Sequence, residues 1–246
     1  MRNLGLLLVA LAVFAGGLAA RLPLGLVTDR IAGPVAFGAV SGTLWDGQVR
    51  GLSVNGETLG DARVRLRFLP LLKGLAVADL AIDGRGLAGA GTASFDGDLL
   101  VLENARGQAD LARFGMIDAF GQTLRGDVEA DIERLAFSLK DGCRVADLTA
   151  RTDALSRSLG VYAGRGFPMS GEGHCDGDVL VIPLAGEGAE AAVRAELRID
   201  RRGRYVSRLA VEPAARELGA FLEGMGFRRD GRAFVTERSG MIEANL

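Results

Sequence analysis

From residue 40 onward, apolar and polar side chains alternate in short stretches that are separated by turn residues. The clearest stretch is residues 62–68, where the even positions are apolar and the odd positions are arginines. Successive side chains of a strand point to opposite faces of a sheet, so this stretch predicts a strand with one buried and one solvent face. Hairpin-type dipeptides recur at Asn55-Gly56, Asp96-Gly97, Asp141-Gly142, Asp176-Gly177, Arg202-Gly203 and Asp230-Gly231. The pattern predicts a mostly β protein: an elongated, curved antiparallel sheet, open or half-barrel, built from repeated hairpins.

The only tryptophan lies in the segment 40–49, which we interpret as the first strand of this sheet. In a strand Trp45 and Gly47 share a face, and the glycine leaves room for the indole ring, so Trp45 is predicted to be a core anchor. The apolar positions change parity directly after this segment, which predicts a β-bulge at Arg50-Gly51. A similar change of phase predicts a second bulge near Glu133-Arg134.

One short helix is predicted near the C-terminus. Pro213 suits its first turn and Gly226 can end it. Four apolar residues recur at helical spacing: Leu218, Phe221, Leu222 and Met225. This stripe either caps an open end of the sheet or docks a partner, because helix-in-groove recognition uses the same spacing.

The N-terminus carries an uncharged apolar run from residue 4 to residue 20, flanked by Arg2 and Arg21. We interpret residues 1–21 as a transmembrane anchor. A secretory signal cleaved near Ala19 or Ala20 and a buried helix of a soluble domain are the alternatives. In the first two cases the rest of the chain is exported: a juxtamembrane arm at residues 22–39, then a β domain at residues 40–246.

An internal repeat indicates that part of the sheet arose from two matched hairpin units, at about residues 75–105 and 143–185. The sequence Val-Ala-Asp-Leu at 77–80 recurs at 145–148, and the segment 95–102 recurs with conservative changes at 175–182. Such duplication suits a sheet that grows by adding hairpins.

The two cysteines occupy equivalent places in this repeat. Cys143 stands where the first copy has Leu75, and Cys175 stands where it has Phe95. An apolar pair that faces across two strands in one copy would become a disulfide in the other, and an oxidising compartment outside the cytoplasm favours the bond. We therefore predict a Cys143–Cys175 disulfide, with two free buried thiols as the alternative.

Composition excludes several function classes. The 36 glycines fit turns and bulges of a sheet, and a net charge of −2 without a basic stripe argues against nucleic acid as a partner. His174 is the single histidine, and its spacing to the cysteines does not suit a metal. The glycine pattern at 84–89 is followed by strand-like sequence where a nucleotide site needs a helix. We expect no catalytic residues, no cofactor and no metal.

The chain resembles protein N of the type II secretion system. The resemblance is carried by the apolar N-terminus followed by Leu-Pro, the two cysteines, the segment 218–231, and above all one distinctive motif. That motif comprises Ser41, Gly42, Thr43, Leu44, Trp45, Asp46 and Gly47. The resemblance implies a bitopic inner-membrane protein with a periplasmic sheet, without an enzymatic motif.

The expected function is a non-enzymatic periplasmic scaffold or interaction domain of type II secretion. Its partners would be other components of the machine, in the inner-membrane platform or the periplasmic secretin domains. The alternative is a periplasmic protein that handles lipids or lipoproteins in a hydrophobic groove. That groove would be lined by Val64, Leu66, Phe68, Val77 and Ile82.

Overall fold

A computed structural model describes residues 23–25, 35–54, 57–114, 126–154, 168–188 and 191–241. The predicted anchor at 1–21 and the Asn55-Gly56 turn lie outside the described residues, and the arm at 22–39 is described only in part. Within the described ranges, no helix is both long and apolar enough to cross a bilayer.

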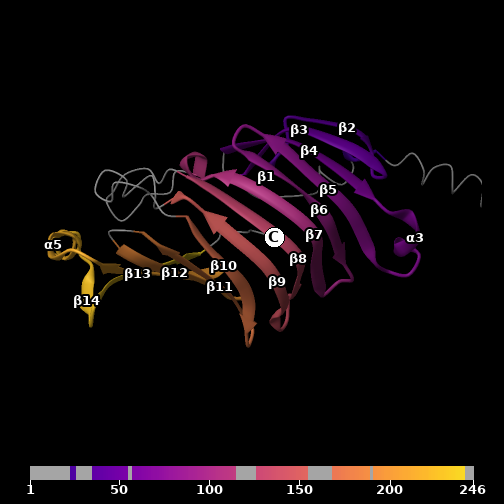
Figure 1. Ribbon diagram of the computed structural model, residues 1–246. Coiled ribbons are helices and arrows are strands. Elements are labelled where there is room, and N and C mark those ends of the chain that lie inside the picture. Colours follow the sequence, from indigo (N-terminus) through magenta and orange to yellow (C-terminus); the bar gives the residue numbers. More distant parts are fainter. Residues whose placement is uncertain are drawn as a thin grey trace, which may run out of the picture.

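The described residues form one 15-stranded antiparallel sheet that bends and twists along its length (Figure 1). From β3 to β13 each strand pairs with the next one in sequence, so this part is a continuous meander. The path starts at β1 and ends at β14, which leaves the sheet open and confirms the predicted class. The strands are β1 (Val35–Ala36), β2 (Ala39–Thr43), β3 (Asp46–Val54), β4 (Glu57–Leu66), β5 (Ala76–Gly84), β6 (Leu87–Phe95), β7 (Leu99–Asp110), β8 (Asp127–Ser138), β9 (Gly142–Thr152), β10 (Met169–Asp176), β11 (Val179–Glu187), β12 (Ala191–Ile199), β13 (Arg204–Pro213), β14 (Arg228–Asp230) and β15 (Ala233–Met241). The helices are α3 (Phe68–Leu71), the 3-10 helix η1 (Leu111–Phe114) and α5 (Arg216–Gly224).

The register keeps apolar side chains on one face across the sheet. Val64 pairs with Leu80 and Ala62 with Ile82, so the apolar positions of β4 and β5 share a face. We call this the apolar face and the opposite one, which carries Arg63 and Arg65, the polar face. The alternation at residues 61–66 is visible in exposure, where odd positions are exposed and even positions are half-buried. This part of the sequence pattern was therefore interpreted correctly.

Two members of the predicted groove lining lie elsewhere. Ala78 pairs with Ala93 on the apolar face. Val77 is the neighbouring residue of the same strand, paired with Ser94, so its side chain points to the polar face. Phe68 is outside the sheet, since β4 ends at Leu66 and α3 begins at Phe68. Pro70 explains this end, because a proline has no N–H for the ladder but is tolerated in the first turn of a helix.

The segment 40–49 is a hairpin, so its prediction as a single strand was wrong. β2 ends at Thr43 and β3 begins at Asp46, and Gly42 of β2 pairs with Gly47 of β3. Gly42 has φ +85°, a conformation that glycine adopts without strain. The Asp46 N–H donates to the Thr43 hydroxyl at 3.3 Å, which closes the turn.

Both predicted bulges are present, and so are the described turns. The register between β3 and β4 shifts between Val49 and Leu52, and that between β8 and β9 shifts between Ile132 and Arg134. The turns at Asp96-Gly97, Asp141-Gly142, Asp176-Gly177, Arg202-Gly203 and Asp230-Gly231 each connect or border paired strands. Local turn chemistry therefore sets where the strands end.

The predicted C-terminal helix is α5, and three residues of its predicted stripe, Leu218, Leu222 and Met225, pack on the sheet. Leu222 is 1% exposed in a cluster with Val193, Val211 and Phe234, and Leu218 and Met225 pack against this cluster. These contacts are those of a cap on the apolar face. Use of the stripe by a partner stays a prediction, and it would require the helix to leave this cluster.

Pro213 does not start the helix, which corrects the sequence prediction. It is the last residue of β13 and pairs with Ala191, and the helix begins only at Arg216. A strand tolerates the proline here because the pairing of β13 with β15 ends earlier, at Val211 to Phe234.

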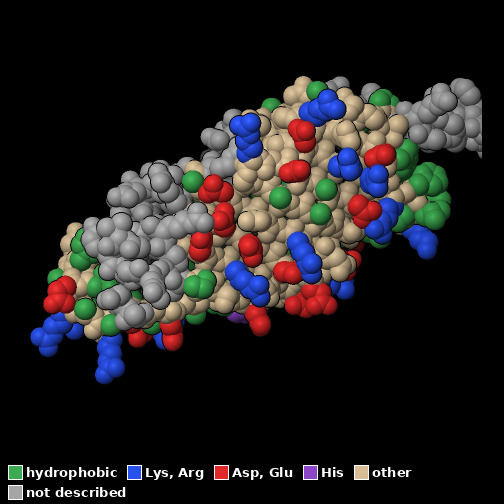
Figure 2. Space-filling view, turned by 45° about the horizontal axis from the view of Figure 1, so that its top comes forward, with side chains coloured by type: hydrophobic (Ala, Val, Ile, Leu, Met, Phe, Trp, Pro, Cys, Tyr) green, Lys and Arg blue, Asp and Glu red, His purple; other side chains and the backbone are tan. Residues whose placement is uncertain are grey.

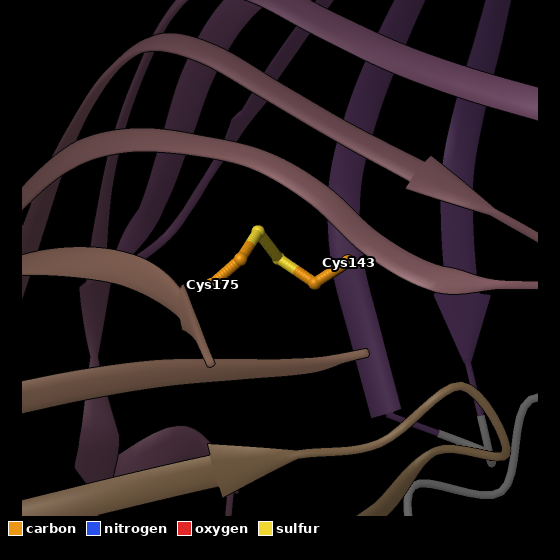
Figure 3. Close-up of a disulfide and its surroundings, with 2 residues drawn as sticks. All are labelled: Cys143 and Cys175. Atoms are coloured by element: carbon orange, nitrogen blue, oxygen red, sulfur yellow. A yellow bond between two sulfur atoms is a disulfide. The ribbon is translucent and has the colours of Figure 1, made fainter. Parts of the chain in front are cut away.

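The predicted Cys143–Cys175 disulfide is present (Figure 3). It joins β9 to β10 with 5.6 Å between the Cα atoms, and Cys143 is buried among Leu148, Ala150 and Leu180. In the first repeat the equivalent hairpin is β5 to β6, where Ala76 pairs with Phe95. The equivalent strands therefore pair in both copies, but Leu75 precedes β5 and does not face Phe95, so the expected apolar pair is not formed in the first copy.

Reduction of this disulfide should destabilise the sheet. The bond closes a loop with a sequence separation of 32. Loss of that constraint on the unfolded chain should lower the free energy of unfolding by about 3 to 4 kcal/mol. Urea unfolding with and without reductant measures the change, and the Cys143→Ala/Cys175→Ala variant should not respond to reductant. Equal midpoints for the oxidised and reduced wild type would contradict the prediction.

Truncation of Leu222 should be costly, because it removes a buried side chain from the contact between α5 and the sheet. Leu222→Ala should lower the free energy of unfolding by about 2 to 5 kcal/mol. Leu69→Ala is the matched control, since Leu69 is 73% exposed, and it should change stability by less than about 0.5 kcal/mol. Denaturant unfolding of both variants tests this. Equal effects would show that α5 does not pack on the sheet as described.

Candidate functional site

The motif residues Ser41 to Gly47 form the β2 to β3 hairpin at one corner of the sheet. The chain that leads into it is fixed there, because Pro23 bridges to Thr43 and the Leu24 N–H donates to the Gly42 carbonyl at 3.3 Å. Leu24 is buried against Gly47, where a Cβ would come within 2.5 Å of the Leu24 Cδ2 atom. The same Cβ would come within 2.8 Å of the Thr43 carbonyl oxygen, which the backbone holds in place, so the turn favours glycine at position 47.

Trp45 lies in the turn of the hairpin and is half-buried, so it is not the centre of a core. Its ring meets that of Phe68 edge to face, with 5.3 Å between the centroids. The adjacent Leu44 carbonyl accepts a hydrogen bond from the Leu66 N–H at 3.1 Å. The motif thus connects the first hairpin to the end of β4, and the sequence prediction of a core anchor is corrected to a corner contact.

Exposed apolar side chains gather where α3 follows β4. Leu69 is 73% exposed and Leu72 69%, and Phe68 and Lys73 are also exposed. We call Trp45, Phe68, Leu69, Leu72 and Lys73 the α3 corner. Figure 2 shows hydrophobic side chains gathered at this end of the molecule, whereas charges of both signs are interspersed over the middle of the visible face. Sequence reasoning missed this surface because it assigned Phe68 to a strand.

The arginines beside this corner are held by carboxylates on neighbouring strands. Arg65 contacts Asp46 at 3.2 Å, and Arg67 donates to Asp79 at 2.6 Å. Thr92 also donates to Asp79 at 2.9 Å. The hydrogen bonds from Arg67 and then Thr92 lower the pKa of Asp79, and Asp79 raises the pKa of Arg67. Arg67 and Asp79 therefore stabilise each other's charged forms, in an ion pair between the residue after β4 and a residue of β5.

The turn aspartates also have a local structural role. Asp96 accepts hydrogen bonds from the backbone N–H groups of Asp98 and Leu99, at 3.0 and 2.8 Å. These bonds, that from Leu99 first, lower the pKa of Asp96. Such a carboxylate stabilises a turn, as aspartates in hairpins commonly do.

A hollow of about 700 Å³ lies on the polar face over β6 to β9. Its charged lining includes Arg106, Arg151, Glu129, Asp131 and Asp147. Arg106 pairs with Asp131 at 3.2 Å, and both side chains are exposed. With Glu133 included, four carboxylates face two arginines, so the lining is net acidic. No sequence motif predicts this hollow, because its residues come from four strands.

The cysteine and histidine considered in the sequence analysis lie apart from one another in function. Cys175 is consumed by the disulfide, and His174 is exposed on β10, opposite Val181. Among the residues that the structure describes, no three His, Cys, Asp or Glu side chains are grouped so that they could hold a metal ion. What the described surface offers is contact area: the α3 corner, the polar hollow and part of the apolar face.

Comparison with known proteins identifies the family. No curated protein and no solved structure gives a significant match to the chain. Residues 33–236 match the sequence model of a family described as type II secretion system (T2SS), protein N. The match covers most of the chain and includes the hairpin motif, the disulfide and α5. The chain therefore belongs to the protein N family of the type II secretion system.

Proposed function

We propose that this chain is a non-enzymatic scaffold of the type II secretion machine, held at the inner membrane by residues 1–21 with its sheet in the periplasm. It would act by contact with other components of the machine, in the inner-membrane platform or the periplasmic domains of the secretin. The observation that carries the proposal is the family match over residues 33–236, which makes the chain a component of this apparatus.

Two further features support the proposed location. The Cys143–Cys175 disulfide is of the kind that persists in oxidising compartments such as the periplasm. The uncharged run at residues 4–20 has about the length that a membrane span needs, with Arg2 and Arg21 placed to reach the two interfaces. Together they support a tether that crosses the bilayer and an oxidised domain on its periplasmic side.

The chemistry of the described surface supports a contact role. A catalytic acid or base needs a pKa near the working pH, whereas Asp79, Asp96 and Asp200 have pKa values lowered by hydrogen bonds that hold pairs and turns together. At Asp200, desolvation by itself would raise the pKa, but the hydrogen bonds from Arg204 and from the backbone of Arg202 outweigh it and lower the pKa. These carboxylates are used to fix the sheet.

Deletion of the gene should reduce export by the type II pathway. Proteins in the medium would be compared between the parent strain, the deletion strain and the deletion strain complemented with the wild-type gene. We expect the exported proteins to accumulate inside the cells of the deletion strain and to return to the medium on complementation. Unchanged export in the deletion strain would overturn the proposed function.

A second candidate function, the handling of lipids or lipoproteins, is favoured by one observation. The apolar face is not fully covered: Leu100 is 46% exposed, and Leu80 and Phe95 are also exposed. Phe95 and Leu100 are directly paired across β6 and β7. By contrast, the far end of the same face is covered by α5 through Leu222. An acyl chain could therefore lie only over the part of the face toward β5 to β7.

A photo-crosslinking residue at position 100 tests this second function. Val145 is the matched control, because it is 40% exposed on the polar face of the same sheet. In cells grown with radiolabelled phosphate, a lipid-handling face predicts labelled phospholipid adducts at position 100 and fewer at position 145. Absence of adducts at position 100, or equal amounts at both positions, would reject the groove.

A further inference from the structure

We propose that the α3 corner rests on the surface of the inner membrane and forms a second membrane contact beside the N-terminal span. This inference rests on the proposed function, since it takes residues 1–21 as the anchor. Its occupant is the interfacial layer of the same bilayer, and the contacting residues are Phe68, Leu69 and Leu72, with Trp45 and Lys73 at their edge.

The path of the chain brings this corner to the membrane. The uncharged run ends at Ala20, and Pro23, three residues later, already bridges to Thr43. Three residues of extended chain reach at most about 11 Å. If residues 4–20 span the bilayer, the hairpin that contains Thr43 is therefore held within about 11 Å of the end of the span.

The hairpin in turn holds α3 at the same place. The hydrogen bond from Leu66 to the Leu44 carbonyl and the ring contact between Trp45 and Phe68 join the β2 to β3 turn to the start of α3. Both contacts are made by the adjacent turn residues Leu44 and Trp45, so α3 lies beside the hairpin and its exposed leucines lie near the end of the span. The position follows from geometry, independently of the side chains that α3 presents.

The side chains suit such a surface. Leu69 and Leu72 are more than two-thirds exposed, which is unfavourable in water and favourable at the boundary between headgroups and acyl chains. Tryptophan is enriched at this boundary, and the Lys73 ammonium can meet anionic headgroups. Arg67 does not add to the attraction, because it is paired with Asp79.

A site-specific fluorescent probe in the full-length protein tests the contact. The chain has two cysteines, and both are in the disulfide, so one introduced cysteine can be labelled alone. Leu69→Cys would carry an environment-sensitive NBD group, and the protein would be reconstituted into vesicles of phosphatidylethanolamine and phosphatidylglycerol. Parallel vesicles would contain lipids brominated near the headgroup end of the acyl chain, which quench the probe on contact.

Two control positions distinguish loss of the α3 contact from loss of the N-terminal anchor. Leu11→Cys lies in the proposed span, and Arg229→Cys lies on β14, at the other end of the sheet from α3 (Figure 1). We expect blue-shifted emission and strong quenching at positions 69 and 11, and neither at position 229. Urea unfolding of the labelled proteins before reconstitution would confirm that each is folded.

The remaining outcomes overturn the inference in distinguishable ways. Quenching at position 11 but not at 69 would refute the second contact and leave the anchor intact, so that the α3 corner would be available to a protein partner. No quenching at either position would refute the anchor itself and, with it, the inference. Equal quenching at 69 and 229 would show that the sheet lies on the membrane without a preferred corner.

Discussion

The ladder of backbone hydrogen bonds between sequential strands is the interaction on which the rest of this structure depends. From β3 to β13 each strand satisfies its backbone groups with its neighbours in sequence. The register then decides which side chains share a face, and a slip of one residue would move an entire strand's apolar set to the polar face. The bulges at Val49 to Leu52 and Ile132 to Arg134 absorb such changes of phase, so the pairing can resume with the apolar side chains on the same side.

Much of this ladder could be predicted from the sequence, because its determinants are local. Alternation at residues 61–66 and glycine turns such as Asp176-Gly177 depend on side-chain direction and on backbone conformations that single residues set. The disulfide required one longer inference. It was available because the repeat placed Cys143 and Cys175 where the first copy has Leu75 and Phe95, and the structure pairs the corresponding strands in both copies.

The errors occurred where tertiary contacts override the local pattern. Alternation alone could not show that Thr43 and Asp46 close a turn, nor that Trp45 would contact Phe68 of α3. The φ angle that proline fixes suits both the first turn of a helix and the end of a strand. Whether Pro213 can belong to β13 depends on where the pairing of β13 with β15 ends, which the sequence pattern does not show. The polar hollow arises from four strands brought together by the register, so no single segment encodes it. The exposed corner comes mostly from the segment 68–73, whose helix interrupts the alternation that had assigned Phe68 to a strand.

The two ends of the sheet differ from its interior in a way that bears on assembly. At one end β1 comprises two residues, and β2, which also pairs with β3, comprises five. At the other end β14 comprises three, Arg228, Arg229 and Asp230, all exposed and all charged. Short, charged edge strands are a device by which natural sheets avoid adding further strands from other molecules. This device is present at the β14 end, which is a poor template for a strand from a second molecule, whereas the strands of the β1 and β2 end carry no charged residue.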